Sequence, residues 1–164
     1  MRKITVLIGL VVSLTACASC IDGAWAKRYR VSSSSMEPTI TRGSTVTAEV
    51  VEPGGYQPRT GDVVVFQPPD TWGAEGQNPP RIYRVVAVPG DTISCCDAQG
   101  RIIRNDAALD ESYVRASDAA RAAFPPVTVP AGKLYLLGDN RGVANDSSHH
   151  GPVPVENVIG IVKL

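Results

Sequence analysis

The sequence predicts a mainly β protein built from antiparallel strands. Short runs rich in Val, Ile and Thr alternate along the chain with breaks such as Pro53-Gly54-Gly55 and Pro89-Gly90-Asp91. These breaks favour turns, because Pro fixes φ and Gly accepts positive φ. Regular short strands separated in this way are typical of antiparallel all-β domains. The expected strands are Ser44–Val51, Asp62–Gln67, Ile82–Val88, Thr92–Cys95, Gly100–Arg104, Leu134–Leu137 and Val158–Val162.

Two stretches lack this strand pattern. Gly73–Pro80 and Asp106–Pro130 are expected to form loops or a small lobe attached to the β core. Within the second stretch, Ser117–Ala123 begins with a good N-cap pair and continues with Ala and Arg, which favour helix. A short helix is therefore predicted there.

The N-terminal segment is predicted to anchor the chain in a membrane. Arg2 and Lys3 precede Ile4–Ile21, which holds 18 residues without a charge. At about 1.5 Å per residue, this segment covers roughly 27 Å of helix, close to the thickness of a bilayer's hydrocarbon core. Trp25 then falls at the interface, where Trp is enriched. We therefore expect an anchor over residues 1–26 and a folded domain over residues 27–164.

Two other interpretations of this segment stay open. Ala24-Trp25-Ala26 fits the small-x-small pattern of a cleaved secretory signal. Leu14-Thr15-Ala16-Cys17 looks like a lipoprotein motif that ends in a lipid-modified cysteine. All three interpretations place the folded domain outside the cytoplasm or at a membrane surface. The flanking charges alone do not decide the orientation, because basic residues lie on both sides of the segment.

Composition and charge exclude several classes of function. Lys plus Arg and Asp plus Glu both number 16, so the net charge is zero and no nucleic-acid partner is predicted. The sequence contains no GxxxxGK[ST] or GxGxxG stretch, and the adjacent His149 and His150 lack partners at metal-ligand spacing. No cofactor or metal is therefore expected.

The four cysteines fall into two pairs. Cys17 and Cys20 lie in the apolar segment, where they are expected to be small packing residues unless Cys17 carries a lipid. Cys95 and Cys96 are neighbours, and adjacent cysteines rarely bridge each other without strain. Free thiols and partners elsewhere are both open for this second pair.

The strongest chemical signal is Val31-Ser32-Ser33-Ser34-Ser35-Met36-Glu37-Pro38-Thr39. Polyserine alone is often a linker, but the residues that follow the serines are too specific for one. A hydroxyl nucleophile needs a fixed turn that exposes its oxygen, a base to take its proton, and donors for an oxyanion. The segment from Ser35 to Thr39 can supply the turn.

Four segments, in order, resemble the type I signal peptidases. Ser35–Thr39 resembles the nucleophile box of that family, and Gly61–Phe66 resembles its first core strand. Arg84–Asp91 resembles the strand that carries the general base. Gly138–Arg141, with the residues up to Pro154, resembles the C-terminal box. The resemblance covers about residues 28–164 and implies an antiparallel β-sheet catalytic core with a small β and loop cap at about residues 92–132.

The resemblance also implies a mechanism. Ser35 is the expected nucleophile, and its backbone N–H and the Ser33 hydroxyl are the expected oxyanion donors. The implied substrates are exported precursors, cleaved after Ala-x-Ala-like sites at the membrane by a single-pass enzyme whose catalytic domain is extracytoplasmic. Met36 is expected to pack beneath the nucleophile. The resemblance assigns the other matching positions to the substrate groove or its support, and these are Pro38, Arg84, Asp139, Asn140, Arg141 and Asp146.

The sequence departs from the family at the general base. Bacterial members place Lys directly before the Arg-Val run and eukaryotic members place His there, but this chain has Tyr83. Burial raises the pKa of a phenol, so Tyr83 serves as a base only if a nearby cation holds it as phenolate. Arg84 is adjacent, but on a strand it points to the opposite face. Lys133 is expected to be a solvated turn residue.

Further departures leave alternatives open. His149 and His150 follow Asp146 and raise the alternative of a serine–histidine–acid arrangement, although they are more simply surface or loop-packing residues. Ala144 stands where many members carry a serine that helps to orient the base, and Ser148 stands where an arginine is common. The sequence therefore predicts a membrane-bound signal peptidase I-like serine endopeptidase. The alternatives are an impaired pseudopeptidase that binds exported chains and a specialised maturation peptidase for conjugative pilins.

Overall fold

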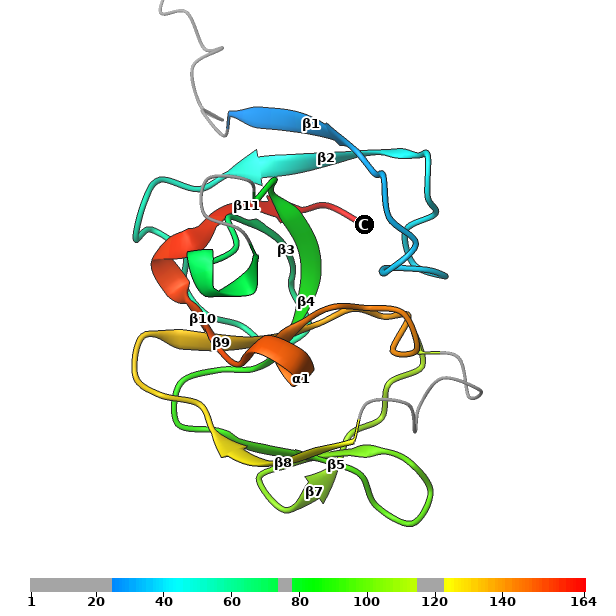
Figure 1. Ribbon diagram of the computed structural model, residues 1–164. Helices are drawn as coiled ribbons and strands as arrows, with labels where there is room; N and C mark the ends of the chain where they lie inside the picture. Colours follow the sequence, from blue (N-terminus) through cyan, green and yellow to red (C-terminus); the bar gives the residue numbers. More distant parts are fainter. Residues whose placement is uncertain (1–24, 74–77, 115–122) are drawn as a thin grey trace, which may run out of the picture.

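The computed structural model describes residues 25–73, 78–114 and 123–164, which form two antiparallel sheets (Figure 1). The larger sheet has the strand order β1-β2-β11-β3-β4-β9-β10, and the smaller one has the order β7-β6-β5-β8. The strands of the larger sheet are β1 (Ala26–Arg30), β2 (Thr45–Val50), β3 (Val63–Phe66), β4 (Arg81–Ala87), β9 (Lys133–Leu137), β10 (Val153–Pro154) and β11 (Val158–Val162). Those of the smaller sheet are β5 (Thr92–Cys95), β6 (Ile102–Arg104), β7 (Ala107–Ala108) and β8 (Phe124–Thr128).

All seven predicted strands are present, and their observed bounds lie close to the expected ones. Four more strands were not predicted, namely β1, β7, β8 and β10. Asp106–Pro130 was expected to form loops or a small lobe, and β7 and β8 lie within it. β8 includes Pro125 and Pro126 and, among the described strands, pairs only with β5. An edge strand tolerates Pro because one of its sides needs no ladder hydrogen bonds.

Three short helical segments complete the described fold. They are η1 (Asp70–Trp72), α1 (Ser147–His150) and η2 (Val155–Asn157). The helix predicted over Ser117–Ala123 and the predicted anchor over Ile4–Ile21 fall outside the described residues, apart from Ala123. In the part of the chain that the structure describes, no helix has the length and hydrophobicity that a bilayer crossing requires.

Strand alternation divides the interior into two hydrophobic clusters. On β4, Tyr83 and Val85 face the cluster inside the larger sheet, whereas Val86 faces the cluster shared with the smaller sheet. On β9, Leu136 faces the first cluster and Leu137 faces the second. Successive side chains point to opposite faces of a strand, so β4 and β9 are buried on both sides. β4 therefore carries side chains of different function on its two faces.

Cys95 and Cys96, at the end of β5, are joined to each other by a disulfide bond. The sequence left free thiols and partners elsewhere open for this pair, and the structure replaces both alternatives with the bond between neighbours.

Candidate active site

The turn that carries Ser35 connects β1 to β2. The Ile40 amide donates to the Met36 carbonyl at 2.8 Å, and the Glu37 amide donates to the Ser34 carbonyl at 3.1 Å. The side chains of Met36 and Ile40 are buried in the first cluster and fix the turn from below. Met36 thus packs into the hydrophobic cluster below the turn, whereas Pro38 is exposed. Ser35 itself is 8% exposed, at the wall of a cavity.

The segment that follows β9, residues 138–141, is hydrogen-bonded to the Ser35 turn. The Asn140 amide donates to the Ser35 carbonyl at 2.9 Å, and the Asn140 side-chain nitrogen donates to the Ser34 carbonyl at 3.1 Å. A Cβ atom at Gly138 would lie 2.6 Å from the Ser35 carbonyl oxygen and 2.5 Å from the Cβ of Ala144. Only glycine fits at such an approach, so Gly138 permits the close contact between this segment and the turn.

A buried ion pair connects this segment to β4. Arg84 Nε donates to Asp139 Oδ1 at 2.9 Å, and Arg84 Nη2 donates to Asp139 Oδ2 at 2.7 Å. The Thr39 hydroxyl also donates to Asp139, which ties the end of the Ser35 turn to the pair. The Arg84 guanidinium lies 4.0 Å from the centre of the Tyr113 ring. Arg84 and Asp139 therefore support the turn through these hydrogen bonds, and their place in a substrate groove stays a prediction.

Arg141 and Asp146 also act as supports. Arg141 Nε donates to the Gly138 carbonyl at 2.9 Å, and its two terminal nitrogens bind Glu111 at 2.7 and 2.9 Å. Asp146 is 1% exposed; its carboxylate caps α1 through the Ser148 amide and accepts the Gly138 amide at 2.9 Å. Glu111 was not among the predicted site residues, because it lies in the stretch that was expected to form loops or a small lobe.

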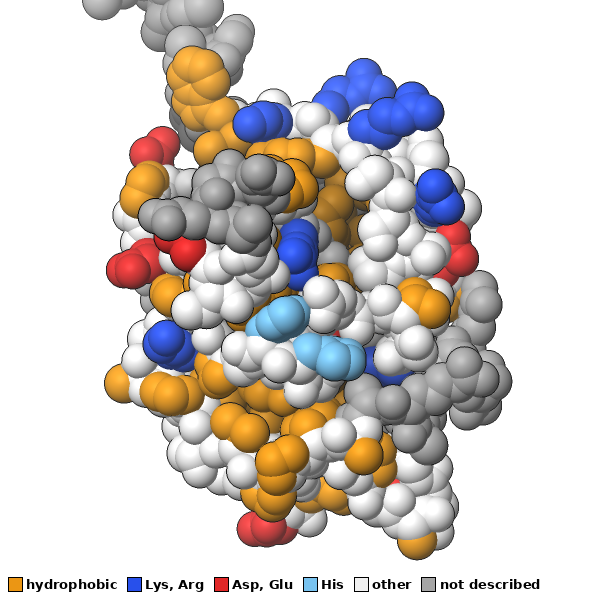
Figure 2. All heavy atoms as spheres, viewed as in Figure 1, with side chains coloured by type: hydrophobic (Ala, Val, Ile, Leu, Met, Phe, Trp, Pro, Cys, Tyr) orange, Lys and Arg blue, Asp and Glu red, His pale blue; other side chains and the backbone are white. Residues whose placement is uncertain are grey.

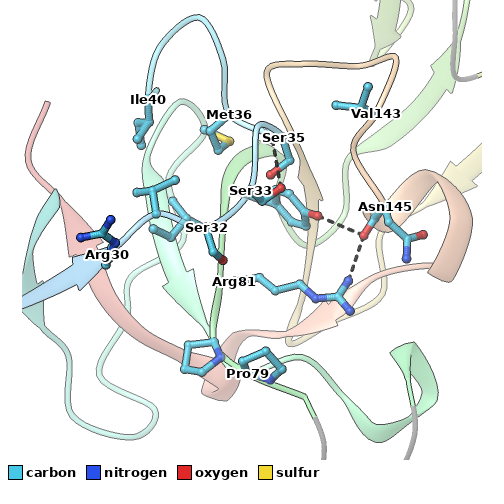
Figure 3. Close-up of a pocket in the computed structure, with 14 residues that line it drawn as sticks. Arg30, Ser32, Ser33, Ser35, Met36, Ile40, Pro79, Arg81, Val143 and Asn145 are labelled. Atoms are coloured by element: carbon cyan, nitrogen blue, oxygen red, sulfur yellow. Dashed lines mark hydrogen bonds between the residues drawn. The ribbon is translucent and has the colours of Figure 1, made fainter. Parts of the chain in front are cut away.

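Tyr83, the position at which the resemblance places the general base, lines the same cavity as Ser35. Its hydroxyl donates to the Asn145 carbonyl at 3.1 Å, and Arg81 Nη1 donates to the same oxygen at 3.0 Å (Figure 3). Burial, followed by the negative charge of Asp146, raises the pKa of Tyr83 above its ordinary value of 10.0. Arg81 and a side-chain hydrogen bond with Ser35 act in the opposite direction but are outweighed. Tyr83 is therefore a neutral phenol at pH 7.

The cation nearest to the Tyr83 hydroxyl is not Arg84 but Arg81, which the sequence analysis missed. Arg84 projects from the other face of β4, as alternation predicts, and binds Asp139. Arg81 lies two residues before Tyr83 and shares its face, so period-two alternation was the signal that could have identified it.

The two expected oxyanion donors contact each other. The Ser35 amide donates to Ser33 Oγ at 3.2 Å, and both serines line the cavity. A substrate carbonyl must displace Ser33 Oγ from the amide before it can receive that hydrogen bond. The Ser33 hydroxyl proton remains available as a second donor, since Oγ is the acceptor in this contact.

The other candidate bases lie elsewhere. Neither histidine lines the cavity at Ser35, and Lys133 does not line it either. His150 Nε2 lies 2.8 Å from Asn145 Oδ1, and its ring stacks on Trp72 at 5.1 Å between centroids. His149 is exposed on the same face, where Figure 2 shows both histidines at the surface. His149 Nδ1 lies 3.9 Å from Asp146 Oδ1, but neither histidine lines the cavity at Ser35, so the structure does not join Ser35 to a histidine–acid pair.

The cavity has a volume of about 320 Å³ and runs from Ser35 along the end of β1 and the start of β4 (Figure 3). Part of its wall is apolar, from Val31, Met36, Ile40 and Ile82. The opposite part is polar, and it includes Arg81, Tyr83 and Asn145. A buried serine at the wall of a pocket, on a turn fixed by a glycine-containing segment, is the arrangement of a serine-nucleophile hydrolase.

The comparisons with known proteins identify the family. Residues 4–164 match the family model described as signal peptidase, peptidase S26, and the chain belongs to this family. It is 34% identical over 135 residues to the probable signal peptidase I-1 of Synechocystis, an alignment that covers 81% of this chain and 66% of that protein. It is 31% identical over 189 residues to signal peptidase I of Mycobacterium tuberculosis, covering 85% of this chain and 64% of the relative.

The chain therefore spans just under two thirds of the length of these two curated relatives. The fold is similar to the crystal structure of a signal peptidase I from Enterococcus faecalis V583, with a TM-score of 0.53. That comparison has 22% sequence identity and covers 66% of this chain and 98% of the other.

Proposed function

We propose that this chain is a signal peptidase I-like serine endopeptidase that cleaves exported precursors after Ala-x-Ala-like sites. The observation that carries the proposal is the position of Ser35 at the wall of the cavity, beside Tyr83 and the Ser33 hydroxyl. The apolar wall, with Val31 and Ile40, suits small apolar side chains such as Ala. The family membership and the similarity to curated signal peptidases support the same activity.

In the proposed reaction, Ser35 Oγ attacks the carbonyl carbon at the cleavage point. The hydroxyl proton passes to the Tyr83 oxygen, which must be a phenolate to accept it. The Ser35 amide and the Ser33 hydroxyl stabilise the oxyanion, a kind of contribution worth about 3 to 4 kcal/mol per donor. Tyr83 then returns this proton to the leaving amine as the peptide bond breaks, and the regenerated phenolate accepts a proton from the water that hydrolyses the acyl-enzyme.

We propose that this chain, as a member of the signal peptidase family, is associated with a membrane. The proposal includes a single anchor within residues 1–26 and a catalytic domain over residues 27–164 on the extracytoplasmic side of the cell membrane. The segment at about 92–132, which contributes the smaller sheet, is the proposed cap. Membrane lipid and exported precursors are the proposed partners.

The proposal is tested by the cleavage of a precursor peptide in detergent by the full chain. A peptide with Ala at the first and third positions before the cut is expected to give two products, which mass spectrometry identifies by their masses. The same peptide with Leu at both positions is the matched control, and its cleavage is expected to be at least about tenfold slower because Leu is larger than the apolar wall suits. Equal cleavage of both peptides, or cleavage elsewhere, would contradict the proposed specificity.

A second candidate function is a binding module that holds exported chains in the same groove without cleaving them. Two observations favour it: the pKa of Tyr83 is raised, and the Ser35 amide is already bound to Ser33. The peptide experiment distinguishes the two functions. Binding of the Ala-x-Ala peptide without products, up to the highest pH at which the chain stays folded, would favour the binding module.

A further inference from the structure

Arg81 occupies a position in the active site that the proposed reaction leaves without a role. It begins β4 and extends across the cavity toward Asn145, whose carbonyl oxygen it shares with the Tyr83 hydroxyl (Figure 3). Its guanidinium is therefore separated from the Tyr83 hydroxyl by one shared acceptor. Ser35 and Arg81 line the same cavity, so a peptide that lies along it with its scissile carbonyl at Ser35 is expected to pass close to this cation.

The guanidinium is held in a fixed orientation before a substrate arrives. Its central carbon lies 5.6 Å from the centre of the Trp72 ring, and Trp72 is 3% exposed. Trp72 is itself fixed by an edge-to-face contact with Phe66, at 5.6 Å between centroids. An arginine held by an aromatic ring and a carbonyl loses little further side-chain entropy when it binds a carboxylate.

Within the described residues, no carboxylate lines the cavity or forms an ion pair with Arg81; the buried Asp146, whose charge acts on Tyr83, is hydrogen-bonded to Gly138 and Ser148 instead. Fourteen described residues line the cavity; none of them is Asp or Glu, and Arg30 is a second basic residue among them. None of the ion pairs recorded within residues 25–73, 78–114 and 123–164 includes Arg81. A partly enclosed cavity with two cations attracts anionic ligands.

We infer that Arg81 selects substrates that carry an Asp or Glu side chain within two positions of the cut. The inference rests on the proposed function, because it names the class of precursor that the same site takes. A carboxylate matches the planar fork of donors that guanidinium presents, and such charge-assisted pairs are stronger than neutral hydrogen bonds. The selecting residue is a specificity determinant, distinct from the Ser35 and Tyr83 pair.

The test measures peptide binding to the full chain carrying Ser35→Ala, by fluorescence anisotropy in detergent. Three Ala-x-Ala peptides each carry one Glu, at the second position before the cut or at the first or second position after it. Each has a partner peptide with Gln at the same position. At least one Glu peptide is expected to bind about tenfold more tightly than its Gln partner at low salt, and the difference is expected to shrink as salt screens the pair.

Three further variants, made in the Ser35→Ala chain, test whether Arg81 causes the preference for Glu over Gln. Arg81→Met is expected to remove the difference between Glu and Gln while the Gln peptides bind as before, which also shows that the variant is folded. Arg81→Lys is expected to retain part of the difference, because the charge remains but the fork is lost. Arg28→Met is the matched control, since Arg28 is exposed on β1 and does not line the cavity.

The outcomes separate the inference from the proposed function. Equal binding of every Glu and Gln pair, or a preference for Glu that persists in Arg81→Met, would overturn the inference and leave the peptidase proposal standing. Failure of all the peptides to bind would count against the proposed function itself.

Discussion

Replacing Ser35 with alanine is expected to reduce the cleavage of an Ala-x-Ala precursor by at least about 1,000-fold, because no other hydroxyl occupies its place. The side chain sits on a turn whose carbonyl is bound by Asn140 and whose underside is packed by Met36. Alanine fits this turn without strain, so the folded structure is expected to persist. Product formation followed by mass spectrometry is the measurement, with the free energy of unfolding measured in parallel.

The neighbouring serine provides the matched control for this prediction. Ser34 lies in the same run but does not line the cavity, and its recorded contacts use the carbonyl that alanine retains. Ser34→Ala is therefore expected to keep cleavage within about twofold of the parent chain. A Ser35→Ala chain that cleaves as fast as Ser34→Ala would exclude Ser35 as the nucleophile.

Replacing Arg84 with methionine is expected to lower the free energy of unfolding by about 3 to 5 kcal/mol, because it leaves a buried carboxylate without its cation. Asp139 is fully buried, and Arg84 supplies two of its hydrogen bonds. The substitution is also expected to destabilise the Ser35 turn, since the Thr39 hydroxyl donates to the same carboxylate. Urea unfolding of the full chain in detergent measures the effect.

The matched control is Arg101→Met. Arg101 pairs with Asp97 at 2.8 Å, but its side chain is 53% exposed, and exposed pairs contribute about 0 to 1 kcal/mol. The double variant Arg84→Met with Asp139→Leu is expected to be more stable than Arg84→Met alone, because it removes the uncompensated charge. A loss below about 1 kcal/mol for Arg84→Met would show that the pair does not support the fold as described.

The sequence was most informative where function depends on contiguous residues. Ser35 and Met36 could be placed from one short motif, and Tyr83 from its position before Arg84. The pairing of Arg84 with Asp139 was not predicted, although both residues were named, because a contact over 55 positions depends on the sheet register. β4 and β9 are neighbours, and that register brings the two side chains together.

Physical reasons explain why the other supporting residues could not be predicted from the sequence. Glu111 and Tyr113 were missed because their segment lacks periodicity. Each supports the site only through a contact with another segment: Glu111 binds Arg141, and the Tyr113 ring lies against Arg84. Asn145 was missed because its backbone carbonyl, which every residue type carries, receives the bonds from Tyr83 and Arg81.

The pH dependence of cleavage tests the central claim, a Ser35 nucleophile with a phenol at the position of its base, most directly. Because burial raises the pKa of Tyr83 above 10.0, the phenolate fraction increases about tenfold per pH unit throughout the range from pH 7 to 10. Buried tyrosines with raised pKa values also make the fold less stable above pH 10, where the unfolded chain ionises first, so measurements stop there.

With Tyr83 as the base, kcat/KM for the Ala-x-Ala precursor is expected to rise without a plateau up to pH 10. Tyr83→Phe is expected to abolish the rise. Tyr83→Lys is expected to level off at a lower pH, since burial lowers the pKa of a lysine. A plateau near pH 7 in the parent chain that survives Tyr83→Phe would contradict the account and point to a different base.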